Sequence, residues 1–150
     1  SMVFLGESGS CKTRIAFERA KRAMLKDKSA RAVFPDDIED LGPRERRDFM
    51  MEIGRPDVLI LDDVLNVGIS SEQMAKFVFN IINKRVREKR TTIVTTQIGA
   101  EEFHKEADKF KNMSKAESQR ILAIIRRLRE KFVLIDFDAE GYDENDSSQF

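Results

Sequence analysis

Cysteine and histidine are almost absent from this sequence, which has one of each among its 150 residues. The single cysteine, Cys11, excludes a disulfide framework within the chain. One cysteine together with one histidine, His104, is too few for a structural zinc site. A chain so poor in cysteine is typical of the reducing cytoplasm, and we expect a cytoplasmic protein.

An excess of charge is also missing, because 27 basic side chains balance 27 acidic ones. Net charge therefore gives no general attraction to nucleic acid or to a membrane, and contact with a polyanion would depend on local patches. No run approaches the roughly 20 apolar residues of a membrane span, and the N-terminus has no apolar signal-peptide region. We expect no association with a membrane.

What the sequence does contain is a regular alternation of strand and helix patterns. The patterns predict strands at 3–5, 31–34, 58–61, 92–97 and 132–137, and helices at 12–26, 44–53, from 70 onward, 100–110 and 115–131, with a short helix after Pro35. Strands that alternate with helices favour an α/β fold with a parallel sheet covered by helices on both faces. We expect one domain over residues 1–137 and an acidic tail over 138–150.

The segment between the first strand and the first helix has the pattern of a phosphate-binding loop. Its members, our predicted nucleotide-binding residues, are Gly6, Glu7, Ser8, Gly9, Ser10, Cys11, Lys12 and Thr13. In such a loop, backbone N–H groups and the N-terminus of a helix face a polyphosphate. We predict that it binds ATP, with Lys12 at the β- and γ-phosphates and the Thr13 hydroxyl on Mg²⁺. Taken alone, the segment leaves open a Gly/Ser-rich turn with an accidental Lys-Thr pair.

Cys11 stands where the pattern of this loop has its second glycine. We expect a small side chain to be tolerated there, because the chain is already turning into right-handed helix at this residue.

Polar residues follow two of the predicted strands directly. Asp62 and Asp63 end the apolar run at 58–61, and Gln97 ends the strand at 92–97. Ligands of open α/β sheets bind beyond the carboxyl ends of the strands, so these side chains should gather around the loop. We predict that Asp62 holds Mg²⁺, that Asp63 polarises the attacking water, and that Gln97 orients this water or senses the γ-phosphate. The alternatives are an ordinary acidic turn and a polar strand end that faces solvent.

The predicted helix at 115–131 carries Arg127 on a flank outside its apolar stripe. An arginine there could complete the site of a neighbouring subunit, because a guanidinium supplied in trans stabilises charge on a transferring phosphate. The residues alone equally allow a solvated basic face.

Several segments together resemble the DnaC/IstB group of AAA+ ATPases. Residues 58–63 match its Walker B strand with paired aspartates, residues 89–97 are similar to its T-S-Q sensor strand, and residues 122–128 are similar to its A-I-L-D-R-L segment. The resemblance covers nearly the whole chain and is strongest over 58–143. It implies an AAA+ P-loop NTPase core with little or no lid domain, and it maps the arginine finger onto Arg127.

The resemblance also implies the biological setting. ATP binding and hydrolysis would be coupled to loading a replicative helicase or to assisting a transposase on DNA, in a nucleotide-dependent homo-oligomer. The cations Lys84, Arg87, Lys89 and Arg90 are candidate contacts with single-stranded DNA, although such a run is also typical of a solvated helix end. Relatives choose their partners through an N-terminal region, and we expect this chain to be a fragment that lacks it.

Two departures from the family pattern keep two other functions open. Cys11 replaces the loop glycine, and Asp143 stands where the family has the arginine of sensor II. The first alternative is a non-hydrolysing adaptor or switch, in which bound ATP or ADP only sets a conformation. The second is a DNA-binding module with a vestigial ATP site.

Overall fold

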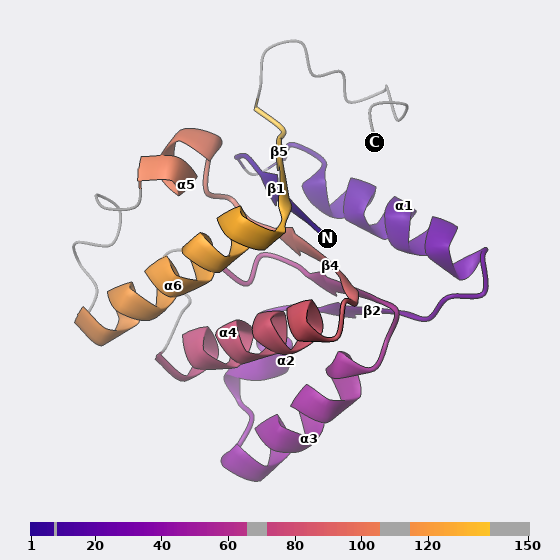
Figure 1. Cartoon of the computed structure of the whole chain (residues 1–150), viewed down its shortest axis with the longest axis horizontal. Helices are drawn as coiled ribbons and strands as arrows, with labels where there is room; N and C mark the ends of the chain where they lie inside the picture. The colour runs from indigo at the N-terminus through magenta and orange to yellow at the C-terminus, as the bar shows by residue number, and fades with distance from the viewer. Residues whose placement is uncertain (8, 66–71, 106–114, 139–150) are drawn as a thin grey trace.

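A five-stranded sheet with the order β2-β3-β4-β1-β5 forms the centre of the structure (Figure 1). The computed structural model describes residues 1–7, 9–65, 72–105 and 115–138. The strands are β1 (Met2–Leu5), β2 (Ala30–Val33), β3 (Val58–Leu61), β4 (Thr91–Thr95) and β5 (Val133–Asp136). Every neighbouring pair is parallel, so the predicted five-stranded parallel sheet is confirmed.

The helices follow the predicted order along the chain. They are α1 (Lys12–Met24), α2 (Asp36–Glu39), α3 (Pro43–Gly54), α4 (Glu72–Arg87), α5 (Ala100–Lys105) and α6 (Lys115–Lys131). α1 ends two residues before the predicted Lys26, and α3 begins with Pro43, whose missing N–H costs nothing in a first helical turn. The predicted helix start at 70–71, the helix continuation over 106–110 and the tail over 139–150 lie outside the described residues.

Each face of the sheet has its own apolar core, because successive strand residues point to opposite faces. In β3, Val58 and Ile60 pack under α1, whereas Leu59 and Leu61 pack under α4 and α6. Figure 1 shows α1 on one side of the sheet and α3, α4 and α6 on the other. This double cover explains why the sequence of β3 is continuously apolar rather than alternating.

The strand register brings the carboxyl ends of the central strands to one edge. Phe4 of β1 lies beside Thr95 of β4, and Leu61 of β3 lies beside Val94. On the other side of β1, Leu5 lies beside Asp136 of β5. The loops that follow these four strands therefore meet, and the candidate site is built from them.

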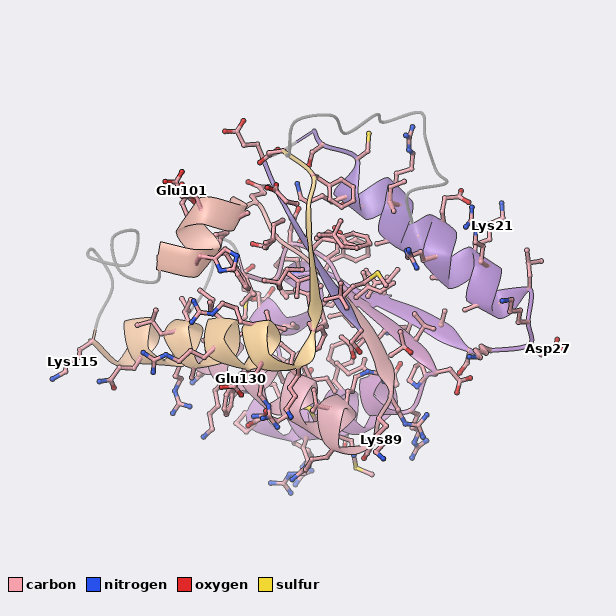
Figure 2. The ribbon with its side chains drawn as sticks, turned by 45° about the horizontal axis from the view of Figure 1, so that its top comes forward. Lys21, Asp27, Lys89, Glu101, Lys115 and Glu130 are labelled. Atoms are coloured by element: carbon pink, nitrogen blue, oxygen red, sulfur yellow. The ribbon has the colours of Figure 1, made fainter. Side chains whose placement is uncertain are left out.

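Charged side chains cover the outside of the molecule. Figure 2 shows Lys21 of α1 and Asp27, in the turn that follows it, directed away from the sheet at the outer surface. Within the described ranges, no helix combines the length and the apolar character that a membrane crossing requires.

Candidate functional site

The loop between β1 and α1 closes around the side chain of Lys12. The Lys12 ammonium donates to the backbone oxygen of Glu7 at 2.6 Å and to Ser10 Oγ at 2.8 Å. Ser10 Oγ in turn donates to the same Glu7 oxygen at 2.8 Å, and only 5% of Lys12 is exposed. The positive charge thus lies inside the curl of the loop, where a polyphosphate would be placed. The predicted loop residue Ser8 lies outside the described residues.

The expectation that Cys11 is already in right-handed helix is wrong. Its φ of 62° and ψ of 14° lie in the left-handed region, just before α1 begins. The left-handed conformation costs a residue with a Cβ roughly 1–2 kcal/mol, whereas glycine adopts it freely. This explains why the loop pattern has glycine at the position of Cys11. Cys11 is the N-cap residue of α1, but its side chain makes no cap hydrogen bond to the first turn of the helix.

Asp62 and Thr13, the two predicted metal-binding residues, are in direct contact. Thr13 Oγ1 donates to Asp62 Oδ1 at 2.9 Å, and Thr95 Oγ1 donates to the same oxygen at 2.8 Å. Thr95 Oγ1 also accepts the N–H of Asp63 at 3.0 Å, and Asp62 is only 6% exposed. Thr95 was not predicted as part of the site. It holds the Asp62 carboxylate toward Thr13.

A magnesium ion fits this pair of oxygen ligands. Mg²⁺ prefers oxygen donors and is commonly held by one or two protein groups, with phosphate and water completing its coordination. Thr13 and Asp62 supply such donors on the side of the loop that faces β3. Among the residues that the structure describes, no group of three or more His, Cys, Asp and Glu is arranged to hold a metal by itself. A Mg²⁺ ion held here by Thr13 and Asp62 would take its remaining ligands from bound phosphate and water.

Asp63 and Gln97 face the loop from the ends of two neighbouring strands. Burial is the main factor that raises the pKa of Asp63, and the adjacent Asp62 carboxylate raises it further. Lys12 and a hydrogen bond with Gln97 oppose this rise. Burial likewise lowers the pKa of Lys12, while Asp63, Asp138 and Asp62 counteract that effect. The acidic and basic groups of the site thus act on one another directly.

An open cleft of about 500 Å³ connects these groups. Its lining consists of Gly9, Ser10, Cys11, Lys12, Thr13, Arg14, Asp63 and Gln97. The size is within the range of small-molecule sites. Arg14 is a lining residue that sequence reasoning missed. Its place one residue after Thr13, at the start of α1, was the available signal.

Arg127 lies apart from this cleft. Its Nε donates to Asn83 Oδ1 of α4 at 2.9 Å, and its guanidinium lies 3.9 Å from the Glu130 carboxylate. The structure therefore does not bring Arg127 together with the loop of its own chain.

The candidate DNA-binding cations at the end of α4 are partly occupied by ion pairs. Lys84 lies 2.7 Å from a Glu88 oxygen, and Arg90 lies 3.4 Å from the other. Arg87 and Lys89 are exposed. To bind a DNA phosphate, Lys84 and Arg90 would thus have to give up their ion pairs with Glu88.

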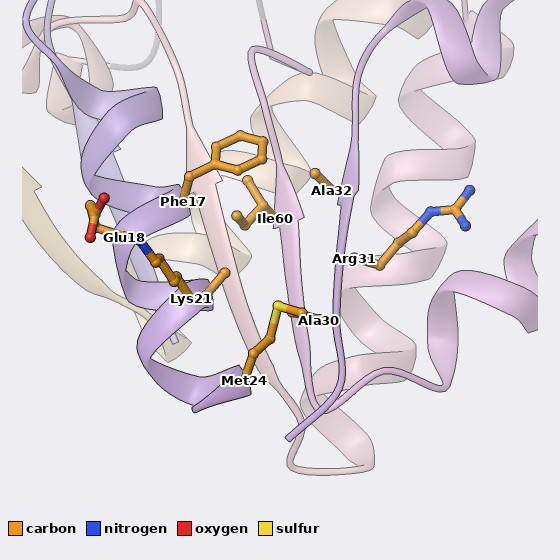
Figure 3. Close-up of a pocket in the computed structure, with 9 residues that line it drawn as sticks. Phe17, Glu18, Lys21, Met24, Ala30, Arg31, Ala32 and Ile60 are labelled. Carbon is orange, nitrogen blue, oxygen red and sulfur yellow. The ribbon is translucent and has the colours of Figure 1, made fainter. Parts of the chain in front are cut away.

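A second hollow of about 270 Å³ lies between α1 and the strands β2 and β3 (Figure 3). Phe17 and Met24 of α1 border it on one side, and Ala30, Ala32 and Ile60 on the other. The lining is mainly apolar, which does not suit a polyphosphate. In Figure 3, Arg31 points away from this hollow.

The family model of the IstB-like ATP binding protein matches residues 1–143. No curated protein matches the chain significantly.

Solved structures share the fold at low sequence identity. DnaI superimposes with a TM-score of 0.70 at 17% identity, over 93% of this chain and 71% of that one. The DnaC helicase loader gives 0.64 at 18% identity, over 89% and 75%. The replication initiator DnaA, bound to AMPPCP and single-stranded DNA, gives 0.66 at 19% identity, over 93% and 40%. The chain therefore spans about two fifths of the DnaA chain. The likeness shows that the α/β fold of this chain is shared with these three proteins.

Proposed function

This chain belongs to the IstB-like ATP-binding proteins, and we propose that it binds ATP with Mg²⁺ and hydrolyses it. One observation carries the proposal. The buried Lys12 ammonium lies inside the loop before α1, and on the same loop Thr13 contacts the Asp62 carboxylate that ends β3. The proposed AAA+ core spans residues 1–137.

The proposed nucleotide-binding residues are those from Gly6 to Thr13. Backbone N–H groups at the start of α1 would bind the phosphates, and Lys12 would exchange its bond to the Glu7 oxygen for bonds to the β- and γ-phosphates. Thr13 and Asp62 would hold Mg²⁺, which neutralises charge on the phosphates when it is bound. The contact between Thr13 and Asp62 supports this assignment.

Asp63 is proposed to polarise the attacking water, and Gln97 to orient it. A carboxylate with a raised pKa is a better proton acceptor than an ordinary one, and burial and Asp62 raise the pKa of Asp63. The hydrogen bond with Gln97 fixes its orientation. Because the base acts only when ionised, hydrolysis should fall as the pH decreases through the raised pKa of Asp63.

Asp63→Asn should reduce single-turnover ATP hydrolysis by about a hundredfold, within the range for loss of a general base. ATP affinity should change little, since the amide retains the shape of the carboxylate. Hydrolysis measured on radiolabelled ATP at excess protein reports the step directly. Asp48→Asn, an exposed change on α3, serves as the control. Equal rates in Asp63→Asn and wild type would reject Asp63 as the base.

Arg127 is proposed as a finger that acts in a neighbouring subunit. Its position on α6, held by Asn83, would then be released on assembly. Arg127→Ala should leave ATP affinity unchanged and lower turnover at least tenfold, only at concentrations where the protein is oligomeric. Turnover followed across a protein dilution series, alongside sedimentation, tests this. If Arg127→Ala and wild type turn over ATP equally fast in the assembled state, Arg127 is not an arginine finger.

The proposed biological role is to couple this ATP cycle to the loading of a replicative helicase or to assistance of a transposase on DNA. Membership of the IstB-like family and the shared fold of the DnaC helicase loader support it. Single-stranded DNA bound to DnaA supports a DNA contact, with Arg87 and Lys89 as its exposed candidates. Stimulation of ATP hydrolysis by single-stranded DNA is the expected result.

A non-hydrolysing nucleotide switch is the second candidate, because Cys11 occupies a backbone conformation that suits glycine. Single-turnover assays with and without single-stranded DNA separate the two. ATP that binds tightly but is not hydrolysed, either with or without single-stranded DNA, would establish the switch and exclude the ATPase.

A further inference from the structure

Asp138, two residues after β5, reaches across to the phosphate-binding loop. Both oxygens of its carboxylate accept the backbone N–H of Glu7, at 2.9 and 3.2 Å. The pairing of β5 with β1 continues up to this point, because the N–H of Phe137 donates to the oxygen of Leu5 at 2.8 Å. Asp138 is also anchored on its own strand, since its N–H donates to Asp136 Oδ1 at 2.9 Å. These backbone hydrogen bonds therefore fix the position from which the Asp138 carboxylate contacts the loop.

The backbone of Gly6 allows the Asp138 carboxylate to come close to the loop. Its φ of 142° is a conformation that residues with a side chain rarely adopt. A Cβ on Gly6 would lie 2.9 Å from Asp138 Oδ1 and 3.1 Å from its Cγ. The absence of a side chain at Gly6 thus lets the carboxylate reach the next N–H along the loop.

Glu7 is consequently held at both of its backbone polar groups. Asp138 accepts its N–H, and its carbonyl oxygen accepts from Lys12 and Ser10. When a nucleotide draws Lys12 toward its phosphates, the bonds to the carbonyl are exchanged, whereas the bond to Asp138 can persist. This contact then becomes the fixed point of the first half of the loop.

We propose that Asp138 is a positioning residue for nucleotide binding, which fixes the first turn of the phosphate-binding loop through the N–H of Glu7. The proposal rests on the proposed ATP-binding function. It adds a residue from the last strand to a site otherwise built from β1, β3 and β4.

Two substitutions separate the hydrogen bond from the charge. Asp138→Asn keeps an oxygen that can accept the Glu7 N–H but removes the charge, whereas Asp138→Ala removes both. Asp48→Ala, an exposed acidic residue on α3, is the matched control. Urea unfolding of each variant shows whether the fold is retained.

The first measurement needs no nucleotide. Hydrogen exchange of the Glu7 amide, followed by NMR, should become at least tenfold faster in Asp138→Ala, because the amide loses its acceptor. Asp138→Asn should restore most of the protection, and Asp48→Ala should exchange like wild type. An unchanged rate in Asp138→Ala would overturn the contact itself.

The second measurement is the affinity for a fluorescent ADP analogue. Asp138→Ala should bind it roughly tenfold more weakly, because a loop that is no longer held in its binding conformation must be ordered when the nucleotide binds. Asp138→Asn should lose less than threefold. Unchanged or tighter binding in Asp138→Ala, or an Asp138→Asn variant as weak as Asp138→Ala, would overturn the positioning role. A wild type that binds no nucleotide would instead reject the proposed function, while the exchange of the Glu7 amide would still decide the contact.

Discussion

Replacing Lys12 with alanine is expected to weaken ATP binding about a thousandfold and to leave the fold intact. The ammonium is buried in the loop, and loss of one partner from a buried, hydrogen-bonded charge pair costs roughly 2–5 kcal/mol. A loss of about 4 kcal/mol corresponds to this factor. The fold should be unaffected, because the hydrogen bonds that Lys12 makes within the described part of the chain go to Glu7 and Ser10 of the same loop.

The thermal stability of Lys12→Ala should equal or exceed that of wild type. Burial lowers the pKa of Lys12, which means that folding disfavours its charged form at neutral pH. Removing the ammonium removes this penalty, as at many functional sites. Fluorescent-nucleotide titration and thermal unfolding give both results, with Lys21→Ala on the exposed side of α1 as the control. Wild-type affinity in Lys12→Ala would exclude the loop as the nucleotide site.

The architecture could be predicted because its signals are local. The apolar run of β3 and the residues that end the strands are visible within a few positions, and parallel strands necessarily align their carboxyl ends. This reasoning brought Lys12, Thr13, Asp62 and Asp63 to one edge, and the structure has them there. Their roles in binding and hydrolysis remain predictions.

The features that sequence reasoning missed depend on distant segments. Thr95 became part of the site only through the register of β4 against β3, which no local pattern fixes. Asp138 belonged to the predicted acidic tail, and its bond to Glu7 joins residues 131 positions apart. The left-handed conformation of Cys11 was missed because we placed this residue in the helix rather than in the turn before it. The glycine in the usual loop pattern carried that information.

Arg85 is the clearest case of a residue whose structural role its sequence context does not reveal. It lies among the cations at the end of α4, which complement the helix dipole, yet its side chain is completely buried. Its guanidinium donates to the carbonyls of Ile53 and Gly54 at the end of α3, at 3.3 and 3.1 Å. Two further backbone oxygens and a hydroxyl, those of Asp57, Thr91 and Thr92, accept at 3.4, 2.7 and 2.9 Å.

These five acceptors match the five N–H donors of a guanidinium. Two of them are carbonyls that every helix leaves without partners at its C-terminus, so Arg85 serves as the cap of α3. Burial is the main factor that lowers the pKa of Arg85, to about 10, and this value still leaves it charged at neutral pH. The residue therefore joins α3, α4, β4 and the residue that precedes β3, at the end of the sheet opposite the nucleotide site.

Arg85→Ala should destabilise the protein by about 3–5 kcal/mol, because it leaves buried carbonyls without donors and opens a cavity. For a domain of this size, the unfolding temperature should fall by roughly 10 °C. Arg85→Lys keeps the charge but offers fewer donors, so its loss should be intermediate. Arg87→Ala, an exposed change two residues away, should stay within about 0.5 kcal/mol of wild type. Urea unfolding of the three variants measures these differences, and equal stability of Arg85→Ala and Arg87→Ala would show that the buried guanidinium does not hold this end of the sheet together.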